Sequence, residues 1–405
     1  MATKYKDSGI PWIGEVPEDW KFLKFKYSGS FEKGKLPNST NAENKGLPII
    51  GASEMNGKEP TIFTEQQDIP LCSNEDILIL WDGANAGLIS NNLQGIVSST
   101  VVKYVCKEKQ CNSGYIYYQY KTLERYFKSK VSGTTIPHMN MKFINDCPLL
   151  LPPLPTQQRI ADFLDRKCAE IDELAALQET MIEELKRYKQ SLITETVTKG
   201  LNKNAKMKDS GVEWIGEIPE RWEVKRLKFV ANRRNEKADD TKLKYIGLEH
   251  IVGFSKEMVE TENVYDNEGA NMCYARDVIF GKLRPYLGKA KVIEDACCCS
   301  SEFIVLCNVH CPDYLRYLLL SGWFIEIVNA STYGTKMPRA NADFIMNMLI
   351  PVPHTNEQQQ IADYLDRKCA EIDELIVIKQ QKIEALKEYK KSVIFEYVTG
   401  KKEVV

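Results

Sequence analysis

The sequence predicts a mixed α/β protein with an internal repeat, in which two globular domains are each followed by a long helix. Three observations lead to this fold class. Near-identical blocks recur 201 or 202 residues apart, each copy holds short apolar runs broken by Gly, Asn and Pro, and each copy ends in a long stretch almost free of Gly and Pro. We expect the two helices to pack antiparallel as a coiled coil and the whole to have pseudo-two-fold symmetry.

Blocks at both ends of each copy carry the repeat. KDSGIPWIGEVPE at 6–18 matches KDSGVEWIGEIPE at 208–220, and IADFLDRKCAEIDEL at 160–174 matches IADYLDRKCAEIDEL at 361–375. Between the blocks several Gly, Asp, Thr and Pro positions keep their register while the residues around them differ. This pattern indicates one scaffold that was duplicated and whose two surfaces then diverged.

The expected boundaries follow from the breaks between these segments. We expect domains at 1–153 and 201–352 and long helices at 154–200 and 353–405. Apolar runs predict strands at 76–80, 100–106, 277–280 and 303–307, and amphipathic runs predict helices at 115–127 and 312–328.

The long helices have expected caps and an expected apolar stripe. Thr156 and Thr355 are candidate N-caps, and Gly200 and Gly400 are placed to end the helices. Gln178 and Lys379 interrupt the stripe at matching positions and are candidates for fixing register. The expected stripe consists of Leu164, Ile171, Leu174, Met181, Leu185, Tyr188 and Leu192 in the first helix and Ile372, Leu375, Ile376, Ile383, Leu386, Val393 and Ile394 in the second.

Composition limits the class of protein. The 405 residues, 43% hydrophobic, suffice for two cores, and no apolar stretch reaches membrane-spanning length, so a cytoplasmic protein without a membrane partner is expected. Twelve cysteines without a signal peptide predict reduced thiols. Cys307, His310 and Cys311 are either metal ligands or, as we favour, ordinary side chains, because no second pair stands at zinc-site spacing.

No catalytic motif is recognised. Gly29, Gly34 and Lys35 satisfy a nucleotide-binding loop, but Leu36 replaces the hydroxyl residue and Pro37 argues against the helix that would follow. Methyltransferase, zinc-protease and nuclease signatures are not found either. We therefore expect a non-catalytic chain that binds no cofactor of its own.

The organisation resembles the specificity subunits of Type I restriction–modification systems, often called HsdS. The resemblance rests on the KDSG-x-x-WIGE-(V/I)-PE block followed by Trp20 or Trp222, and on the Pro-rich run that ends in Gln157-Gln158 or Gln358-Gln359 before IAD(F/Y)LDRK. It covers essentially the whole chain, in the order domain, helix, domain, helix.

This resemblance implies a prokaryotic reader of double-stranded DNA. Each target recognition domain would read one half of a split, asymmetric site, and the helices would hold the domains apart and dock two methylation subunits. Those partners would carry the S-adenosylmethionine chemistry, and restriction subunits that use ATP and Mg²⁺ would join to translocate and cut DNA. The net charge of −2 leads us to expect weak DNA binding by the isolated chain.

Candidate DNA contacts lie on loops at matching positions of the two copies, because DNA is contacted by cationic, amide and hydroxyl side chains. One loop is 281–289, which corresponds to 81–87 in the first copy, and another follows Gly133 or Gly334. The candidates are Lys33, Lys35, Asn85, Thr134, Thr135 and His138 in the first domain, and Arg233, Arg234, Lys282, Arg284, Tyr286, Lys289, Thr335, Lys336 and Arg339 in the second.

Two further sets have both a structural and a functional interpretation. We favour packing anchors between domain and helix over DNA stacking for the tryptophans Trp12, Trp20, Trp214 and Trp222. The repeated helix charges are either partner contacts or solvated residues: Asp165, Arg166, Lys167, Asp366, Arg367 and Lys368.

Two alternative functions remain open from the sequence. A coiled-coil scaffold that binds proteins rather than DNA fits the matched helices and the modest charge. A self-contained DNA-modifying enzyme fits less well, because the catalytic motifs are missing. Binding to DNA only together with a methylation subunit, with steep salt dependence, would separate the first hypothesis from the reader.

Overall fold

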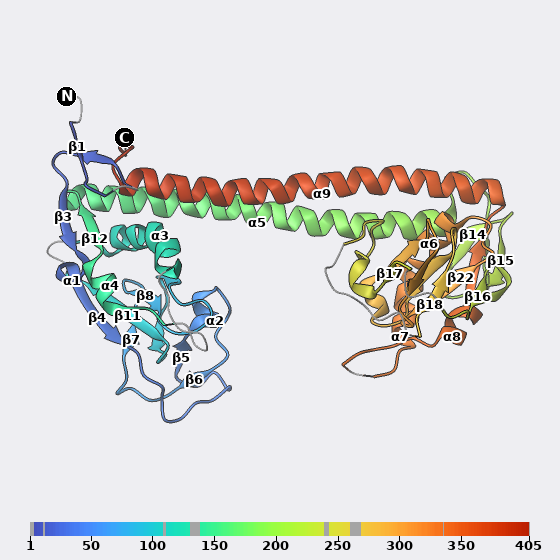
Figure 1. Ribbon diagram of the computed structural model, residues 1–405, viewed down its shortest axis with the longest axis horizontal. Coiled ribbons are helices and arrows are strands. Elements are labelled where there is room, and N and C mark those ends of the chain that lie inside the picture. Colours follow the sequence, from blue (N-terminus) through green and yellow to red (C-terminus); the bar gives the residue numbers. More distant parts are fainter. Residues whose placement is uncertain are drawn as a thin grey trace. The chain divides into compact units, whose positions relative to one another are not determined.

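The protein was analysed as a computed structural model that describes residues 4–10, 13–107, 111–129, 138–238, 243–259, 269–334 and 336–404. Its contacts divide the chain into two compact units (Figure 1), of which the first consists of two segments and the second of one. Unit 1 comprises 1–178 and 381–405, and unit 2 comprises 179–380. Each unit therefore contains one globular domain and parts of both long helices.

Two four-stranded sheets form the domain of unit 1. The first has the order β4-β11-β8-β9 and is antiparallel, and the second has the order β6-β5-β10-β7, with β5 and β10 parallel. Two small antiparallel pairs, β1-β2 and β12-β3, complete the strands. The bounds are β1 Tyr5–Asp7, β2 Glu15–Pro17, β3 Lys21–Lys24, β4 Gly29–Lys33, β5 Leu47–Ile50, β6 Phe63–Thr64, β7 Leu71–Cys72, β8 Ile77–Leu80, β9 Ile89–Ser90, β10 Gly95–Val97, β11 Val101–Cys106 and β12 Pro148–Leu151.

The domain of unit 2 repeats this topology, except that its second sheet has three strands rather than four among the described residues. Its antiparallel sheet β16-β22-β19-β20 corresponds to β4-β11-β8-β9, and β17-β21-β18 again contains one parallel pair. The pairs β13-β14 and β15-β23 match those of unit 1. The bounds are β13 Met207–Asp209, β14 Glu217–Pro219, β15 Glu223–Arg226, β16 Asn232–Arg234, β17 Tyr245–Ile246, β18 Asn271–Cys273, β19 Val278–Gly281, β20 Ala290–Val292, β21 Cys297–Cys299, β22 Phe303–Cys307 and β23 Leu349–Val352.

Short helices cover these sheets. The helix expected at 115–127 is present, and the one expected at 312–328 is divided into α6 and α7 at Leu320 and Ser321. All four expected strands are present as β8, β11, β19 and β22. The helical bounds are α1 Phe25–Ser28, α2 Ala52–Met55, α3 Ser113–Ser129, α4 Met141–Asp146, η1 Leu227–Phe229, η2 Leu248–His250, η3 Pro285–Leu287, α6 Pro312–Leu319, α7 Gly322–Ala330 and α8 Ala342–Asn347.

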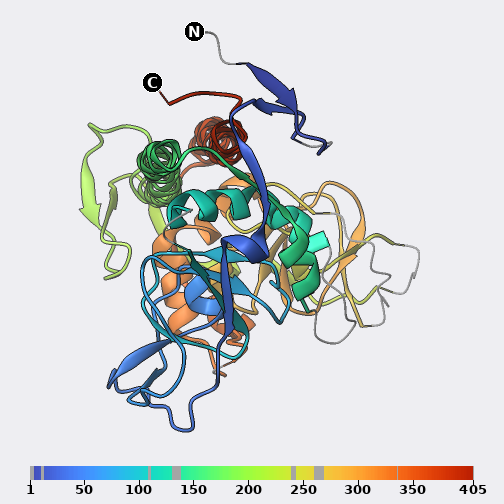
Figure 2. The ribbon, with the colours of Figure 1, turned by 90° about the vertical axis from the view of Figure 1, so that its left-hand side faces the viewer.

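The long helices are α5, Leu154–Lys199, and α9, Thr355–Val398, and they pack together in antiparallel directions within each unit. In unit 1 the rings of Phe163 and Tyr397 lie 4.4 Å apart (Figure 2 shows these helices end-on). In unit 2 Lys379 Nζ lies 3.4 Å from Met181 Sδ. The expected antiparallel helices are therefore confirmed.

The helix ends agree with the expected glycines but not with the expected N-caps. Gly200 and Gly400 follow α5 and α9 with φ of +75° and +70°, a conformation that glycine adopts without strain. Thr156 lies inside α5, and Thr355 is the first residue of α9. Gln157 and Gln358 of the expected junction instead donate side-chain hydrogen bonds to Pro152 O and Pro353 O, which tie the first turn of each helix to the segment before it.

The expected apolar stripe is confirmed in part, since six of its residues are buried: Leu164, Ile171, Ile372, Ile383, Val393 and Ile394. Leu174, Tyr188 and Leu375 are exposed, whereas Gln178 and Lys189 are buried. The apolar pattern of the sequence did not identify the buried lysine. A lysine can bury its aliphatic stem when its ammonium group pairs with a carboxylate. The ammonium group of Lys189 forms an ion pair with the carboxylate of Asp373. Gln178 Oε1 has no hydrogen-bond partner among the described residues, and its role in register stays a prediction.

Both domain cores include side chains from both long helices. In unit 1 Tyr115, Phe127 and Leu164 pack with Val393 and Val398 of α9. In unit 2 the corresponding core joins α6 and α7 to residues of α5 and α9, among them Ile193, Val197, Ile361 and Leu365. Each domain is therefore fixed to a helix pair rather than to one helix.

Candidate nucleic-acid interface

In unit 2 the two loops predicted to contact DNA lie against each other. The loop after β19 donates a hydrogen bond from Arg284 N to Pro338 O at 2.7 Å, and Ala340 N donates to Lys282 O at 2.9 Å. A further bridge joins Leu283 to Arg339. Residues that are more than fifty positions apart thus form one surface.

Arg284 occupies an unusual backbone position in this surface. Its φ of 50° and ψ of 61° are left-handed, a conformation that costs a residue with a side chain roughly 1–2 kcal/mol. The bond to Pro338 O holds the strained backbone, and Nη2 lies 3.4 Å from Lys336 O. The exposed Arg284, Tyr286 and Lys336 are consequently presented on a fixed frame.

The other basic candidates of unit 2 are engaged internally to different degrees. Arg234 makes a bidentate pair with buried Asp277, at 2.9 and 3.1 Å, and stacks on Tyr274. Arg339 donates to Glu302 through Nε and Nη2 and remains half-exposed. Arg233 lies 3.4 Å from Asp343 and is exposed. This geometry favours a structural role for Arg234.

Two lysines of the loop are partly buried. Burial lowers the pKa of Lys282, and the nearby cations Arg233 and Arg339 lower it further against the opposing effect of Glu302. Burial also lowers the pKa of Lys289, whose Nζ donates to Leu248 O at 2.5 Å. Lys282 therefore belongs to a cluster of positive charge, while Lys289 is tied to η2.

Unit 1 brings its corresponding segments together in the same way. Met139 N donates to Trp81 O, and Asp82 pairs with His138 across an antiparallel bridge. Asp82 also gathers two candidates, since its carboxylate lies 2.6 Å from His138 Nδ1 and 3.7 Å from Lys33 Nζ. The candidates Lys35 and Asn85 are exposed. Thr134, Thr135 and Thr335 lie outside the described residues.

Several residues that shape this surface were not among the sequence candidates. Asp82 and Glu302 orient basic side chains, and Tyr333 and Met337 expose large side chains beside Lys336 and Arg339. An acidic residue is not expected in a DNA contact, which is why charge alone missed the first two. The position of Tyr333 next to the repeated Gly334 was the available signal for the third.

The described tryptophans behave differently from one another. Trp20 and Trp222 are buried, and Trp222 Nε1 donates to Glu357 of α9 at 2.9 Å, as expected for anchors between domain and helix. Trp214 is 44% exposed, and its packing role stays a prediction. Trp12 lies outside the described residues.

The repeated helix charges also divide into two groups. Asp165 accepts a hydrogen bond from Tyr118 at 2.7 Å, and Asp366 accepts one from Tyr317 at 2.6 Å, so both face their own domain. Lys167 and Lys368 pair with Glu170 and Glu371 on their own helices. Arg166 and Arg367 are exposed.

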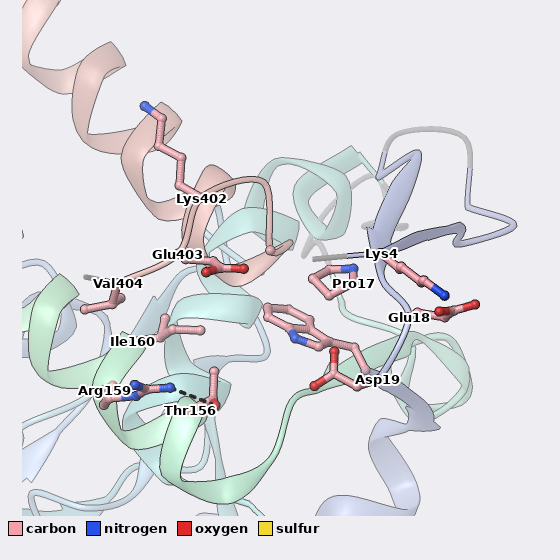
Figure 3. Close-up of a pocket in the computed structure, with 12 residues that line it drawn as sticks. Lys4, Pro17, Glu18, Asp19, Thr156, Arg159, Ile160, Lys402, Glu403 and Val404 are labelled. Atoms are coloured by element: carbon pink, nitrogen blue, oxygen red, sulfur yellow. Dashed lines mark hydrogen bonds between the residues drawn. The ribbon is translucent and has the colours of Figure 1, made fainter. Parts of the chain in front are cut away.

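A cavity of about 640 Å³ lies in unit 1 beside Trp20 and Ile160 (Figure 3). Arg159 Nη2 donates to Thr156 Oγ1 at its edge, at 3.3 Å. Lys4, Arg159 and Lys402 contribute three positive charges to the lining, and Glu18, Asp19 and Glu403 contribute three negative ones. This balance does not favour a polyanion, so the cavity is not part of the candidate interface.

Among the residues that the structure describes, no group of three or more His, Cys, Asp and Glu side chains is arranged to hold a metal ion. Cys307 and Cys311 are free and buried, as the favoured interpretation expected. No helix in the described ranges is long and apolar enough to cross a membrane.

Comparison with known sequences gives a consistent family. Residues 17–187 and 219–388 each match the Type I restriction modification DNA specificity domain. The chain is 31% identical to the Type I restriction enzyme MjaVIII specificity subunit of Methanocaldococcus jannaschii, over 95% of this chain and 93% of the relative. It is 20% identical to the EcoDI specificity subunit of Escherichia coli, over 89% and 83%.

Solved structures share the fold. One chain, from a study of complex assembly and conformational transition of the type I R-M system, superposes with a TM-score of 0.69 at 15% identity, covering 95% of this chain and 99% of that one. The HsdS subunit of Thermoanaerobacter tengcongensis superposes with a TM-score of 0.52 at 16% identity, covering 95% and 98%. With two family matches that span most of its length, the chain belongs to the Type I restriction–modification DNA specificity subunits, which are non-catalytic.

Proposed function

We propose that each domain of this chain reads one half of a bipartite, asymmetric DNA site. In this proposal the reading domains are 1–153 and 201–352, and the segments 154–200 and 353–405 are the spacer helices. The observation that carries it is the pairing of two loops in each domain, 81–87 with His138 and 282–289 with Arg339. Divergent side chains on a repeated frame suit two different half-sites.

The side chains of unit 2 suit base reading in the major groove. An arginine can donate two hydrogen bonds to guanine, and Arg284 and Arg339 offer guanidinium groups beside the exposed Lys336. Lys282 and Arg233 suit the neighbouring phosphates. Unit 1 offers a different set, because Asn85 suits adenine and Lys33, Lys35 and His138 suit phosphate or base edges.

The helices in this proposal dock two methylation subunits. Leu174 and Leu177 of α5 are half-exposed, and so are Leu375 and Ile378, their counterparts in α9. Matched apolar pairs one helical turn apart are the feature expected of a surface that meets the same partner twice. Those partners would bind S-adenosylmethionine, and ATP and Mg²⁺ would be used by restriction subunits joined through them.

The test is co-expression of the chain with its methylation subunit in a methylation-free host, followed by single-molecule mapping of modified adenines. The expected result is a split, asymmetric motif that requires both proteins. A stable complex with an active methylation subunit but no such motif would contradict the reading role and favour a protein-binding scaffold.

A further inference from the structure

Both domains expose an aromatic ring beneath a lysine at the same place in the repeat. Lys26 Nζ lies 5.1 Å from the centre of the Tyr27 ring, and Lys228 Nζ lies 5.5 Å from that of Phe229. Tyr27 is 53% exposed and Phe229 is 73% exposed. Neither pair is used by the proposed DNA interface or by the helix surface.

The same buried anchor fixes the backbone before each ring. Phe25 and Leu227 are fully buried and come two residues before the exposed rings. Phe25 N donates to Cys147 O at 3.2 Å, and Leu227 N donates to Met348 O at 2.9 Å. With the anchor residue turned inward, the short helical turns α1 and η1 carry their rings on the outer surface.

A second basic residue precedes each lysine by two positions and is bound by a residue at the end of a neighbouring helix. At the end of α4, Asp146 accepts from Lys24 at 3.0 Å and from Lys26 at 3.4 Å. At the end of α8, Asn347 accepts from Arg226 at 3.4 Å. No carboxylate among the described residues pairs with Lys228. We call these two sets the aromatic–lysine patches, Lys24, Lys26 and Tyr27 in unit 1 and Arg226, Lys228 and Phe229 in unit 2.

The chemistry of the patches points to a protein rather than to DNA. A phenylalanine offers no hydrogen bond to a phosphate or to the edge of a stacked base. Burial of such a ring against an apolar surface is favourable because it removes the ring from water. Aromatic residues are accordingly enriched at protein–protein interfaces. Because Lys228 pairs with no carboxylate among the described residues, an acidic group on the partner would complement its charge.

The repeat indicates how many partners there are. A contact kept on both halves of a chain whose DNA-facing loops have diverged suits a protein present in two copies. We propose that each aromatic–lysine patch binds one methylation subunit, at a surface that combines an apolar pocket with at least one carboxylate. This inference rests on the proposed function and adds a docking contact on each domain to the one on the helices.

The experiment measures assembly of the full-length chain with the methylation subunit in the absence of DNA, by native mass spectrometry across a dilution series. We expect Phe229→Ala to weaken one of the two binding events by about tenfold or more, and Tyr27→Ala to weaken the other. The double variant should weaken both. Lys228→Glu should act like Phe229→Ala, and its effect should shrink as salt is raised.

Tyr333→Ala is the matched control, because this exposed aromatic residue lies in the candidate DNA surface of unit 2. It should leave assembly unchanged while DNA binding by the assembled complex falls. Wild-type assembly of the Phe229 and Tyr27 variants would overturn the inference, as would a loss confined to DNA binding. If the unmodified chain failed to bind the methylation subunit, the proposed function itself would fail, a result distinct from a patch-specific loss.

Discussion

Lys189 of α5 places its Nζ 2.7 and 2.8 Å from the two carboxylate oxygens of Asp373 in α9. Its counterpart in the repeat is Lys390 of α9, which lies 2.6 and 2.8 Å from the oxygens of Asp172 in α5. The same ion pair therefore occurs once in each unit with the two helices exchanged. The environments differ, because only 9% of the Lys189 side chain is exposed, against 31% for Lys390.

Removing the acidic partner should expose this difference. Asp373→Asn leaves a buried ammonium group without its counter-charge and should lower the free energy of unfolding by about 1–3 kcal/mol, less than for a fully enclosed pair because Asp373 is half-exposed. Asp172→Asn should cost less than about 1 kcal/mol. Urea unfolding followed by circular dichroism measures both, and equal losses would contradict the distinction.

Arg284→Ala should affect the reading of DNA without affecting the fold. Its guanidinium is exposed, so stability should hardly change, whereas loss of a bidentate contact to guanine costs about 1–3 kcal/mol. Methylation mapping should show one relaxed position in one half-site only. An unchanged motif and unchanged affinity would remove Arg284 from the base-reading residues.

Arg234→Ala should lower the stability of the fold without changing the DNA motif that is read. It leaves Asp277 buried without its guanidinium partner, which we expect to lower the free energy of unfolding by roughly 2–4 kcal/mol. The folded fraction should still direct methylation to the wild-type motif. Thermal unfolding and methylation mapping of the same preparation test this, and a stable variant with an altered motif would show that Arg234 contacts DNA.

Lys282 should give DNA binding an alkaline limit. Because burial lowers its pKa below 10.5, the ammonium charge is lost earlier than on an ordinary lysine as pH rises, and DNA affinity should fall with it. Folding responds with the opposite sign: the neutral amine is favoured in the folded state, so this residue's contribution to stability grows between the lowered pKa and 10.5.

Lys282→Arg keeps its charge throughout, and its affinity should therefore exceed that of the unmodified complex increasingly as pH rises toward 10.5. Salt-matched fluorescence anisotropy measures the difference. Lys336→Arg, at an exposed lysine of the same surface, controls for the effect of introducing arginine. Parallel pH profiles for the unmodified and Lys282→Arg complexes would contradict the assignment.

The repeat made most of the fold predictable. Strands such as β8 and β22 are visible in the sequence as short apolar runs. Gly200 and Gly400 end their helices because glycine adopts a left-handed conformation without strain. The helix seam was harder, since Lys189 is buried by virtue of a partner that lies 184 residues away in the chain. No local pattern records such a pairing.

The candidate surface was predictable to the level of its loops but not of its side chains. The sequence placed 282–289 and 336–339 separately, and only the fold brings Arg284 to Pro338. It also treated Arg233 and Arg234 alike, whereas alternation along β16 turns one toward Asp343 and the other toward Asp277. Tertiary partners, not residue type, separate a contact residue from a structural one.

The hydrogen bonds from Tyr118 to Asp165 and from Tyr317 to Asp366 are equivalent attachments of a domain to a long helix. Asp165 and Asp366 lie at the same place in the repeat, and neither belongs to the loops of the candidate DNA surface. A domain moved from one of these positions to the other would therefore find an aspartate at the equivalent place on the helix, able to accept the same hydrogen bond. If the domains read DNA as proposed, we expect new specificities to arise by exchange of whole domains on an unchanged pair of helices.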